Sequence, residues 1–225
     1  KERLLTLSNL HKIKLPKNNT IFIPHSRLKP TDFIRQNFFN QKFSIDKNQT
    51  IVLHLGWIHD VMDSYNLSAS TQVWDSTYQL ILHERSKRNL SDPYIQRLSA
   101  LKSNSLHLSL NPVPYNELGT LIQSCDVGLV IYDPTNYGSS WENIAKASGK
   151  LADYLAFGKP VICSNLPDLK QLMSDYKCGF CYNELSEIPS LISKIIDEYS
   201  YYSENALKCF DEEFDFSKSF APLLK

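Results

Sequence analysis

The stretch Thr50-Ile51-Val52-Leu53-His54-Leu55-Gly56 is a continuous apolar run that ends at a glycine. This pattern is typical of a strand in a parallel sheet that helices cover on both faces. Similar runs follow at residues 78–82, 106–110, 127–132, 160–163 and 179–182, and helical patterns occur at residues 91–101, 114–124, 150–157, 191–199 and 204–214. The alternation predicts an α/β fold, a doubly wound and mostly parallel Rossmann-like sheet. In such sheets ligands bind at the carboxyl ends of the strands, so we expect the functional site in the strand-to-helix loops.

The composition excludes several classes of protein. Of the 225 residues, 42% are hydrophobic and 21% are charged, which is too apolar for a disordered chain. The 24 basic residues balance the 24 acidic ones, whereas a general nucleic-acid coat needs a basic excess. No apolar run approaches the roughly 18 residues that a membrane-spanning helix needs. We therefore expect a cytoplasmic globular protein that does not bind nucleic acid.

The five cysteines are an odd number in a chain large enough to bury its own core, which favours reduced and mostly buried thiols. Cys178 and Cys181 have the CxxC spacing found in metal and redox sites. A structural zinc ion takes four ligands, and no second CxxC or HxxH pair accompanies these two in the sequence. The sequence therefore predicts no metal site.

Ser148-Gly149-Lys150 stands where a helix is expected to begin. Backbone N–H groups are unpaired at such a position and the helix dipole is positive, so a hydroxyl, a glycine and an ammonium group are suited to bind a phosphate there. Asp153 lies about one turn further along, where it could accept hydrogen bonds from a ribose. A purely structural alternative stays open: Ser148 caps the helix, and Lys150 pairs with Asp153 at i,i+3.

Residues 150–162, KLADYLAFGKPVI, resemble the donor-binding segment of GT-B glycosyltransferases, and most closely that of the large retaining family that carries a KLxEYLAxGKPVI stretch. Other segments agree in order and spacing. Residues 51–56 resemble the first strand and glycine turn of that donor domain, residues 108–118 and 124–129 its strand, loop, helix and next strand, and residues 209–224 its closing helix.

The resemblance implies two parts in the chain. Residues 50–225 are expected to be the Rossmann-like nucleotide-sugar donor domain, the C-terminal half of a GT-B architecture. Residues 1–49 are uneven, with a helical pattern at 2–10 and a strand-like run at 20–23. We expect them to be a linker with the remnant of an N-terminal acceptor-binding domain, most of which is missing from this chain.

The resemblance also implies a set of donor-binding residues at the strand ends. Lys150 and Arg85 are expected to neutralise the charge that grows on the departing nucleotide diphosphate. The residues expected to bind the donor are Ser148, Gly149, Lys150, Asp153, Gly56, His59, His83, Val113, Tyr132 and Asn143. Val113 belongs to a loop that resembles the one whose backbone binds the base, and His59 and His83 fit equally well as surface or core histidines. The donor is a nucleotide-diphosphate sugar, expected to carry UDP, and no metal or other cofactor is expected.

The sequence departs from the family pattern at several positions, among them Asp153 in place of Glu and His83-Glu84-Arg85 in place of a glycine pair, and two further departures bear on activity. The first acidic residue of the pattern, eight positions before the second, falls on Ala145, and the Arg usually found after the first glycine is absent after Gly56. The leading hypothesis is a hexosyltransferase that moves sugar to a glycan, lipid or protein acceptor, in the cytoplasm or at a membrane surface. This chain would supply the donor-binding half and bind nucleotide without transferring sugar by itself. The alternatives are a non-catalytic GT-B-like subunit that binds and stabilises a partner glycosyltransferase, and a hydrolysing nucleotide-sugar epimerase.

Overall fold

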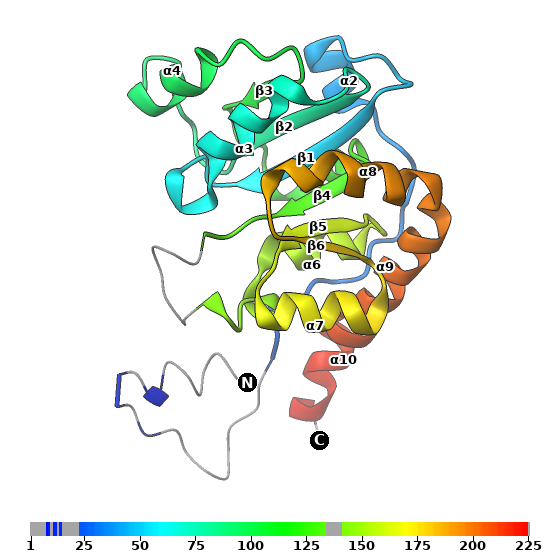
Figure 1. The fold of residues 1–225 in the computed structure, drawn as a ribbon. Coiled ribbons are helices and arrows are strands. Elements are labelled where there is room, and N and C mark those ends of the chain that lie inside the picture. Colours follow the sequence, from blue (N-terminus) through cyan, green and yellow to red (C-terminus); the bar gives the residue numbers. More distant parts are fainter. Residues whose placement is uncertain (1–7, 10, 13, 15–22, 134–140, 225) are drawn as a thin grey trace.

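The computed structural model of the chain describes residues 8, 9, 11, 12, 14, 23–133 and 141–224 (Figure 1). The helical pattern at residues 2–10 and the strand-like run at 20–23 lie outside these residues, except for residues 8, 9 and 23. No helix in the described part of the chain combines the length and the apolar character needed to cross a bilayer.

One sheet of six parallel strands forms the centre of the protein (Figure 1). Its spatial order is β3 (Leu106–Ser109), β2 (Tyr78–Glu84), β1 (Thr50–Gly56), β4 (Val127–Val130), β5 (Val161–Ser164) and β6 (Gly179–Tyr182). Every predicted apolar run overlaps one of these strands, so the expected doubly wound parallel sheet is confirmed. The strand order reverses between β1 and β4, which is where ligands bind in sheets of this class.

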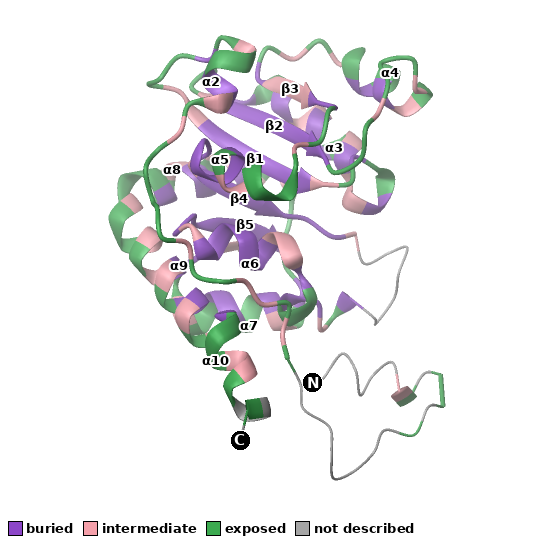
Figure 2. Cartoon of the chain, turned by 180° about the vertical axis from the view of Figure 1, so that it is seen from behind, coloured by how far each residue is buried: buried purple, intermediate pink, exposed green. Residues whose placement is uncertain are grey.

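Helices cover both faces of the sheet. They are α2 (Phe38–Phe43), α3 (Ser64–Ser70), α4 (Pro93–Ser99), α5 (Leu118–Gln123), α6 (Gly149–Ala156), α7 (Pro167–Tyr176), α8 (Ile188–Asp197), α9 (Tyr199–Glu213) and α10 (Phe216–Phe220). Apolar side chains of α2, α5, α6, α7 and α9 form one core, and those of α3, α4 and α8 form the other. The strands β1, β2, β4 and β5 are almost wholly buried, and the edge strands β3 and β6 are partly exposed (Figure 2). The sequence patterns did not predict α2, α3 and α7.

Residues 23–36, here named the N-terminal strap, run along the helices of one face before α2. Arg27 pairs with the chain beyond α9: its amide donates to the carbonyl of Phe214 at 3.0 Å, and its carbonyl accepts from Phe216 at 2.9 Å. After the strap, Phe39 of α2 is fully buried in the core. The division of the chain at residue 50 stays a prediction, but residues 37–49 contribute to the core of the sheet domain.

Tyr154 ties α6 to the middle of the sheet. Its side chain is fully buried, and its hydroxyl donates to the carbonyl of Leu53 at 2.6 Å and accepts from the amide of Leu55 at 2.9 Å. Burial raises the pKa of Tyr154 well above its usual value, so the hydroxyl keeps the proton that it donates. The ring lies against Gly128 of β4, where an added β-carbon would come within 2.4 Å of it. The glycine therefore makes the room that the tyrosine fills.

The Tyr154 hydroxyl gives a first testable expectation. Tyr154→Phe keeps the ring but leaves the Leu53 carbonyl and the Leu55 amide without this partner inside the protein. We expect the free energy of unfolding in urea to fall by about 1–3 kcal/mol. Tyr201→Phe, at a side chain on the surface, is the control and should change it by less than about 0.5 kcal/mol. Equal stability of Tyr154→Phe and the control would show that the hydroxyl does not hold α6 in place.

Candidate functional site

The candidate site lies at the edge of the sheet where the strands end. Gly56 closes β1 with φ at +129°, a conformation that side-chain-bearing residues rarely adopt. The amide of Arg85, directly after β2, donates to the carbonyl of Gly56 at 3.2 Å. Past the end of β4, the amide of Asp133 donates to the carbonyl of Val61 in the loop after β1 at 3.2 Å. The loops after β1, β2 and β4 therefore meet at one edge.

Ser148 and Tyr132 join the first turn of α6 to the end of β4. The Ser148 hydroxyl caps the helix by accepting from the amide of Leu151 at 3.3 Å, as the structural alternative predicted. It also lies 2.7 Å from the Tyr132 hydroxyl, and both side chains are buried. The Tyr132 ring packs edge-on against Trp141, with 4.8 Å between the ring centres. The helix start and the strand end thus form one rigid unit.

Lys150 lies in the same unit. Its ammonium group donates to the carbonyl of Ile131 at 2.9 Å and stands 4.2 Å from the centre of the Tyr132 ring. Burial lowers the pKa of Lys150 from 10.5 to about 7. The unfolded chain holds this proton up to about pH 10.5 and the folded chain only to about pH 7, so Lys150 makes the folded state more stable as pH rises through that window. A buried cation near its pKa is well placed to gain an anionic partner.

Asp153 has a partner that the sequence did not suggest. Arg27 of the N-terminal strap donates to both carboxylate oxygens, through Nε and, at 3.0 Å, through Nη2. Lys150 contacts Ile131 instead, so the alternative of an i,i+3 pair with Asp153 is wrong. The Asp153 residue is only 7% exposed. In this structure its carboxylate is bound to a guanidinium group, and its role towards a ribose stays a prediction.

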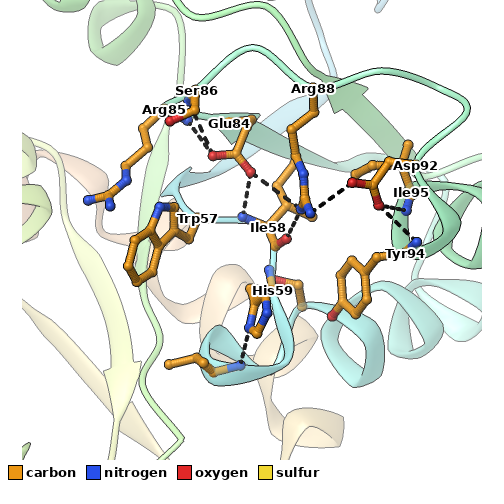
Figure 3. Close-up of polar contacts among 12 residues, drawn as sticks. Trp57, Ile58, His59, Glu84, Arg85, Ser86, Arg88, Asp92, Tyr94 and Ile95 are labelled. Carbon is orange, nitrogen blue, oxygen red and sulfur yellow. Dashed lines mark hydrogen bonds and ion pairs between the residues drawn. The ribbon is translucent and has the colours of Figure 1, made fainter.

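A second group of residues fixes the loops after β1 and β2 (Figure 3). The carboxylate of Glu84, the last residue of β2, accepts from the amides of Ile58 at 2.9 Å, Arg85 at 2.9 Å and Ser86 at 3.3 Å. Arg88 lies 3.8 Å from the same carboxylate and donates to the carbonyl of Ile58 at 2.5 Å. It also pairs with Asp92, the residue that caps α4, at 3.0 Å. Glu84 and Arg88 therefore clamp the two loops together.

The clamp presents Trp57, Arg85 and His59 at the edge (Figure 3). The Arg85 guanidinium lies 3.8 Å from the centre of the exposed Trp57 ring. His59 caps the short 3-10 turn Asp60–Met62 and stacks on Tyr94, with 5.9 Å between the ring centres. A cavity of about 500 Å³ opens beside them, lined by Trp57, Ile58, His59, Val61, Glu84, Ser86, Lys87 and Arg88. Two of the expected donor-binding side chains, Arg85 and His59, thus lie at the carboxyl edge of the sheet.

Of three further expected residues, His83 is a core side chain, and Val113 and Asn143 lie in loops that follow β3 and β4. His83 is only 2% exposed, bonds to the Ser109 hydroxyl at 2.9 Å and meets the edge of the Phe39 ring. Burial, with a smaller effect of Lys42, lowers the pKa of His83 to about 4, which favours the neutral form of this core histidine. Val113 is half-buried and packs against the core beside α5. Asn143 is half-buried in the loop before the 3-10 turn Ala145–Ala147.

The two cysteines of the CxxC pair point to different neighbours. The Cys181 sulfur lies 3.4 Å from that of Cys163, whereas the Cys178 sulfur lies 3.9 Å from that of Met173. All five cysteines are free thiols. Across the residues that the structure describes, no three His, Cys, Asp or Glu side chains gather as a metal ion would require.

The sequence patterns did not point to Glu84, Arg88 or Arg27. Glu84 carried one usable signal, because an acid at the end of a buried strand needs a partner of opposite charge, and Arg88 follows it closely. Arg27 carried none, since 126 residues separate it from Asp153.

The clamp gives a second expectation. In Glu84→Gln one acceptor oxygen becomes an NH₂ group that faces backbone N–H donors. We expect the free energy of unfolding to fall by about 1.5–3 kcal/mol, as measured in urea. Glu117→Gln, at an exposed carboxylate, should change it by less than about 0.5 kcal/mol. A loss no larger than that of the control would mean that the Glu84 contacts do not stabilise the loops.

Comparisons with known proteins bear on this arrangement. The family model for the glucosyltransferase 3-like, C-terminal domain matches residues 68–212. No curated protein matches the chain in sequence. Similar solved structures include HepE from Anabaena in complex with UDP, with 16% identity and a TM-score of 0.62 over 83% of this chain and 50% of that one. Sucrose-phosphate synthase from Thermosynechococcus elongatus has 13% identity and a TM-score of 0.64 over 97% and 54%.

The C-terminal domain of a group 1 glycosyl transferase, LpcC from Francisella tularensis, is matched over almost its whole length. It has 11% identity and a TM-score of 0.56, over 88% of this chain and 95% of that one. By contrast, this chain spans about half the length of HepE and of the synthase. The likenesses confirm the fold expected from the sequence, the Rossmann-like C-terminal half of a GT-B architecture.

Proposed function

Because the chain belongs to the family of glucosyltransferase 3-like proteins, whose C-terminal domain it contains, we propose that it binds the nucleotide-diphosphate-sugar donor of a glycosyltransferase. The observation that carries the proposal is the position of Lys150. Its ammonium group is held in the first turn of α6, against the end of β4 and beside the point where the strand order reverses. A diphosphate at this edge would meet a helix start and a cation together.

The chemistry follows from what a sugar donor must lose. When the glycosidic bond forms, the nucleotide diphosphate leaves and negative charge grows on its outer phosphate. Lys150 is the cation proposed to stabilise this charge, with Arg85 at the neighbouring loop as a second one. Ser148 and Tyr132 hold the turn that carries Lys150, so little rearrangement accompanies the charge transfer. The acceptor is proposed to be a glycan, lipid or protein, held by a further acceptor-binding half.

UDP is the proposed nucleotide, and no metal is proposed to be required. HepE, a structural neighbour, has been solved with UDP and with UDP-glucose. Thermal-shift screening of UDP, GDP, CDP and ADP tests the base, because a ligand at about 100 times its dissociation constant stabilises by about 2.7 kcal/mol. The same screen in EDTA tests the metal, since a metal-dependent site would lose its shift there. Equal small shifts with all four nucleotides would contradict a UDP site.

Substitution of Lys150 tests the site itself. Lys150→Met keeps the apolar stem and removes the charge, and should weaken UDP binding by about 1.5–3 kcal/mol, roughly ten- to a hundredfold. Lys150→Arg keeps a positive charge and serves as the matched control, with a smaller loss. Calorimetric titration of the two variants measures this. Unchanged affinity in Lys150→Met would remove the main reason for placing the donor here.

The lowered pKa of Lys150 adds a pH dependence. The free chain loses this proton near pH 7, whereas a bound diphosphate favours the charged form. UDP affinity should therefore fall by up to about tenfold for each pH unit above 7. In Lys150→Arg the guanidinium stays charged, so affinity between pH 7 and 9 should be nearly constant. Identical pH profiles for the wild type and Lys150→Arg would show that Lys150 does not contact the diphosphate.

A second candidate function is that of a non-catalytic subunit. The feature that favours it is the absence of the first acidic residue of the family pattern. Ala145 stands there, 3% exposed. A non-catalytic subunit that stabilises a partner glycosyltransferase needs no carboxylate at this position. Transfer assays of the partner complex with wild type and Lys150→Met distinguish the two: loss of transfer supports the donor-binding role, and unchanged transfer supports the subunit role.

A further inference from the structure

The ion pair between Arg27 and Asp153 joins the N-terminal strap to the helix that carries the proposed donor site. The guanidinium binds the carboxylate side-on, through Nε and, at 3.0 Å, through Nη2. The two side chains are 18% and 10% exposed. A charge-assisted pair of this geometry is among the stronger hydrogen-bonded contacts in proteins, and it fixes the plane of the guanidinium.

The strap that supplies Arg27 is fixed on either side of it. The amide of His25 donates to the carbonyl of Lys146 at 2.7 Å. The backbone of Arg27 pairs with Phe214 and Phe216, and Lys29 binds Asp211 at 2.7 Å. These contacts hold the strap on both sides of Arg27 against α9, the chain that follows it and the turn that precedes α6.

Arg27 faces the first turn of α6. A β-carbon added at Gly149 would stand 3.1 Å from Nε2 of His25 and 3.2 Å from Nη2 of Arg27. The other side of the guanidinium looks towards the Tyr115 ring, 5.9 Å from its centre. A groove of about 600 Å³ opens beside the pair, and Arg27, Tyr115, Asn116 and Asp153 are among the residues that line it. The strap therefore brings a guanidinium to the residues proposed to bind the donor phosphates.

We propose that Arg27 is a donor-binding residue that contacts the diphosphate, and that Asp153 positions Arg27 and does not bind the ribose. This inference rests on the proposed function and adds to it the way in which the donor is recognised. The loop after Gly56 lacks an arginine, and Arg27 brings one to the same edge from a distant part of the chain.

Asp153 should bind the guanidinium of Arg27 in preference to the hydroxyls of a ribose. Ribose hydroxyls are neutral donors, whereas the guanidinium is a cation with two parallel N–H groups, so exchange would replace stronger contacts by weaker ones. Exchange would also leave the charge of the half-buried Arg27 without its partner, which is unfavourable. Displacement of Arg27 by the ribose is therefore unfavourable, and the carboxylate stays paired with Arg27 when the nucleotide binds.

The first test needs no variant. The wild-type chain is titrated with UDP and with 2′,3′-dideoxyuridine diphosphate, which lacks both ribose hydroxyls. We expect dissociation constants that agree within about threefold, because no carboxylate binds the hydroxyls. A larger loss with the dideoxy nucleotide overturns the inference.

The second test removes the guanidinium without leaving a buried charge. In the double variant Arg27→Gln/Asp153→Asn the pair becomes neutral and can still form a hydrogen bond. We expect the affinities for UDP and for inorganic pyrophosphate both to fall about tenfold or more. If Asp153 bound the ribose instead, UDP affinity would fall and pyrophosphate affinity would not. An unchanged or increased pyrophosphate affinity overturns the inference.

The matched control is the other arginine–aspartate pair of the strap. Arg35 binds Asp126 at the opposite edge of the sheet, before β4. Arg35→Gln/Asp126→Asn makes the same chemical change there and should leave both affinities at wild-type values. Failure of the wild type to bind UDP would refute the proposed function and this inference together. Binding of UDP that depends on the ribose hydroxyls would refute this inference alone.

Discussion

The contact between Tyr154 and the strands β1 and β4 is the constraint on which the rest of the structure depends. The ring occupies the space left by Gly128, and the hydroxyl binds the backbone of β1 at Leu53 and Leu55. One side chain therefore sets both the height and the rotation of α6 over the strands on either side of the reversal point. Since Ser148, Lys150 and Asp153 lie within six residues of Tyr154 on that helix, their positions at the sheet edge follow from this contact.

Three segments of the chain surround the proposed site. On one side, α6 and the end of β4 form a packed unit in which a hydroxyl pair and an aromatic contact fix the helix start. On the other side, Glu84 and Arg88 fix the loops after β1 and β2 through backbone hydrogen bonds. The N-terminal strap closes a third side with Arg27. Cations from three segments, Lys150, Arg85 and Arg27, thus lie around an edge where a diphosphate would bring negative charge.

The sequence predicted the fold well because the strands are covered on both faces. The runs at residues 50–56 and 179–182 coincide with β1 and β6, and the helix expected at 150–157 is α6, shifted by one residue. Three helices, α2, α3 and α7, were missed because they begin in polar segments and only a few of their side chains reach the core. The apolar pattern is therefore sufficient to predict the strands of the sheet. It is a weaker signal for the helices, which bury only one side.

The site could be predicted only in part, since its polar contacts join distant segments. Ser148 was predicted as a helix cap because capping depends on neighbouring residues. The sequence alone left His83 undecided between site and core, and burial beneath Phe39 decides for the core. The partner of Asp153 came from a strap that the sequence assigned to a linker. Contacts between residues so far apart in the chain depend on the tertiary fold, and the spacing of neighbouring residues does not reveal them.

The central claim is that the first turn of α6 holds the donor diphosphate. Hydrogen exchange of the backbone amides, measured residue by residue with and without saturating UDP, tests this claim most directly. The account predicts slower exchange with UDP at residues 149–151 and in the loop at 57–59, and unchanged exchange in α8, on the opposite face of the sheet. Unchanged exchange at residues 149–151 under saturating UDP, or protection centred on α8, would contradict it.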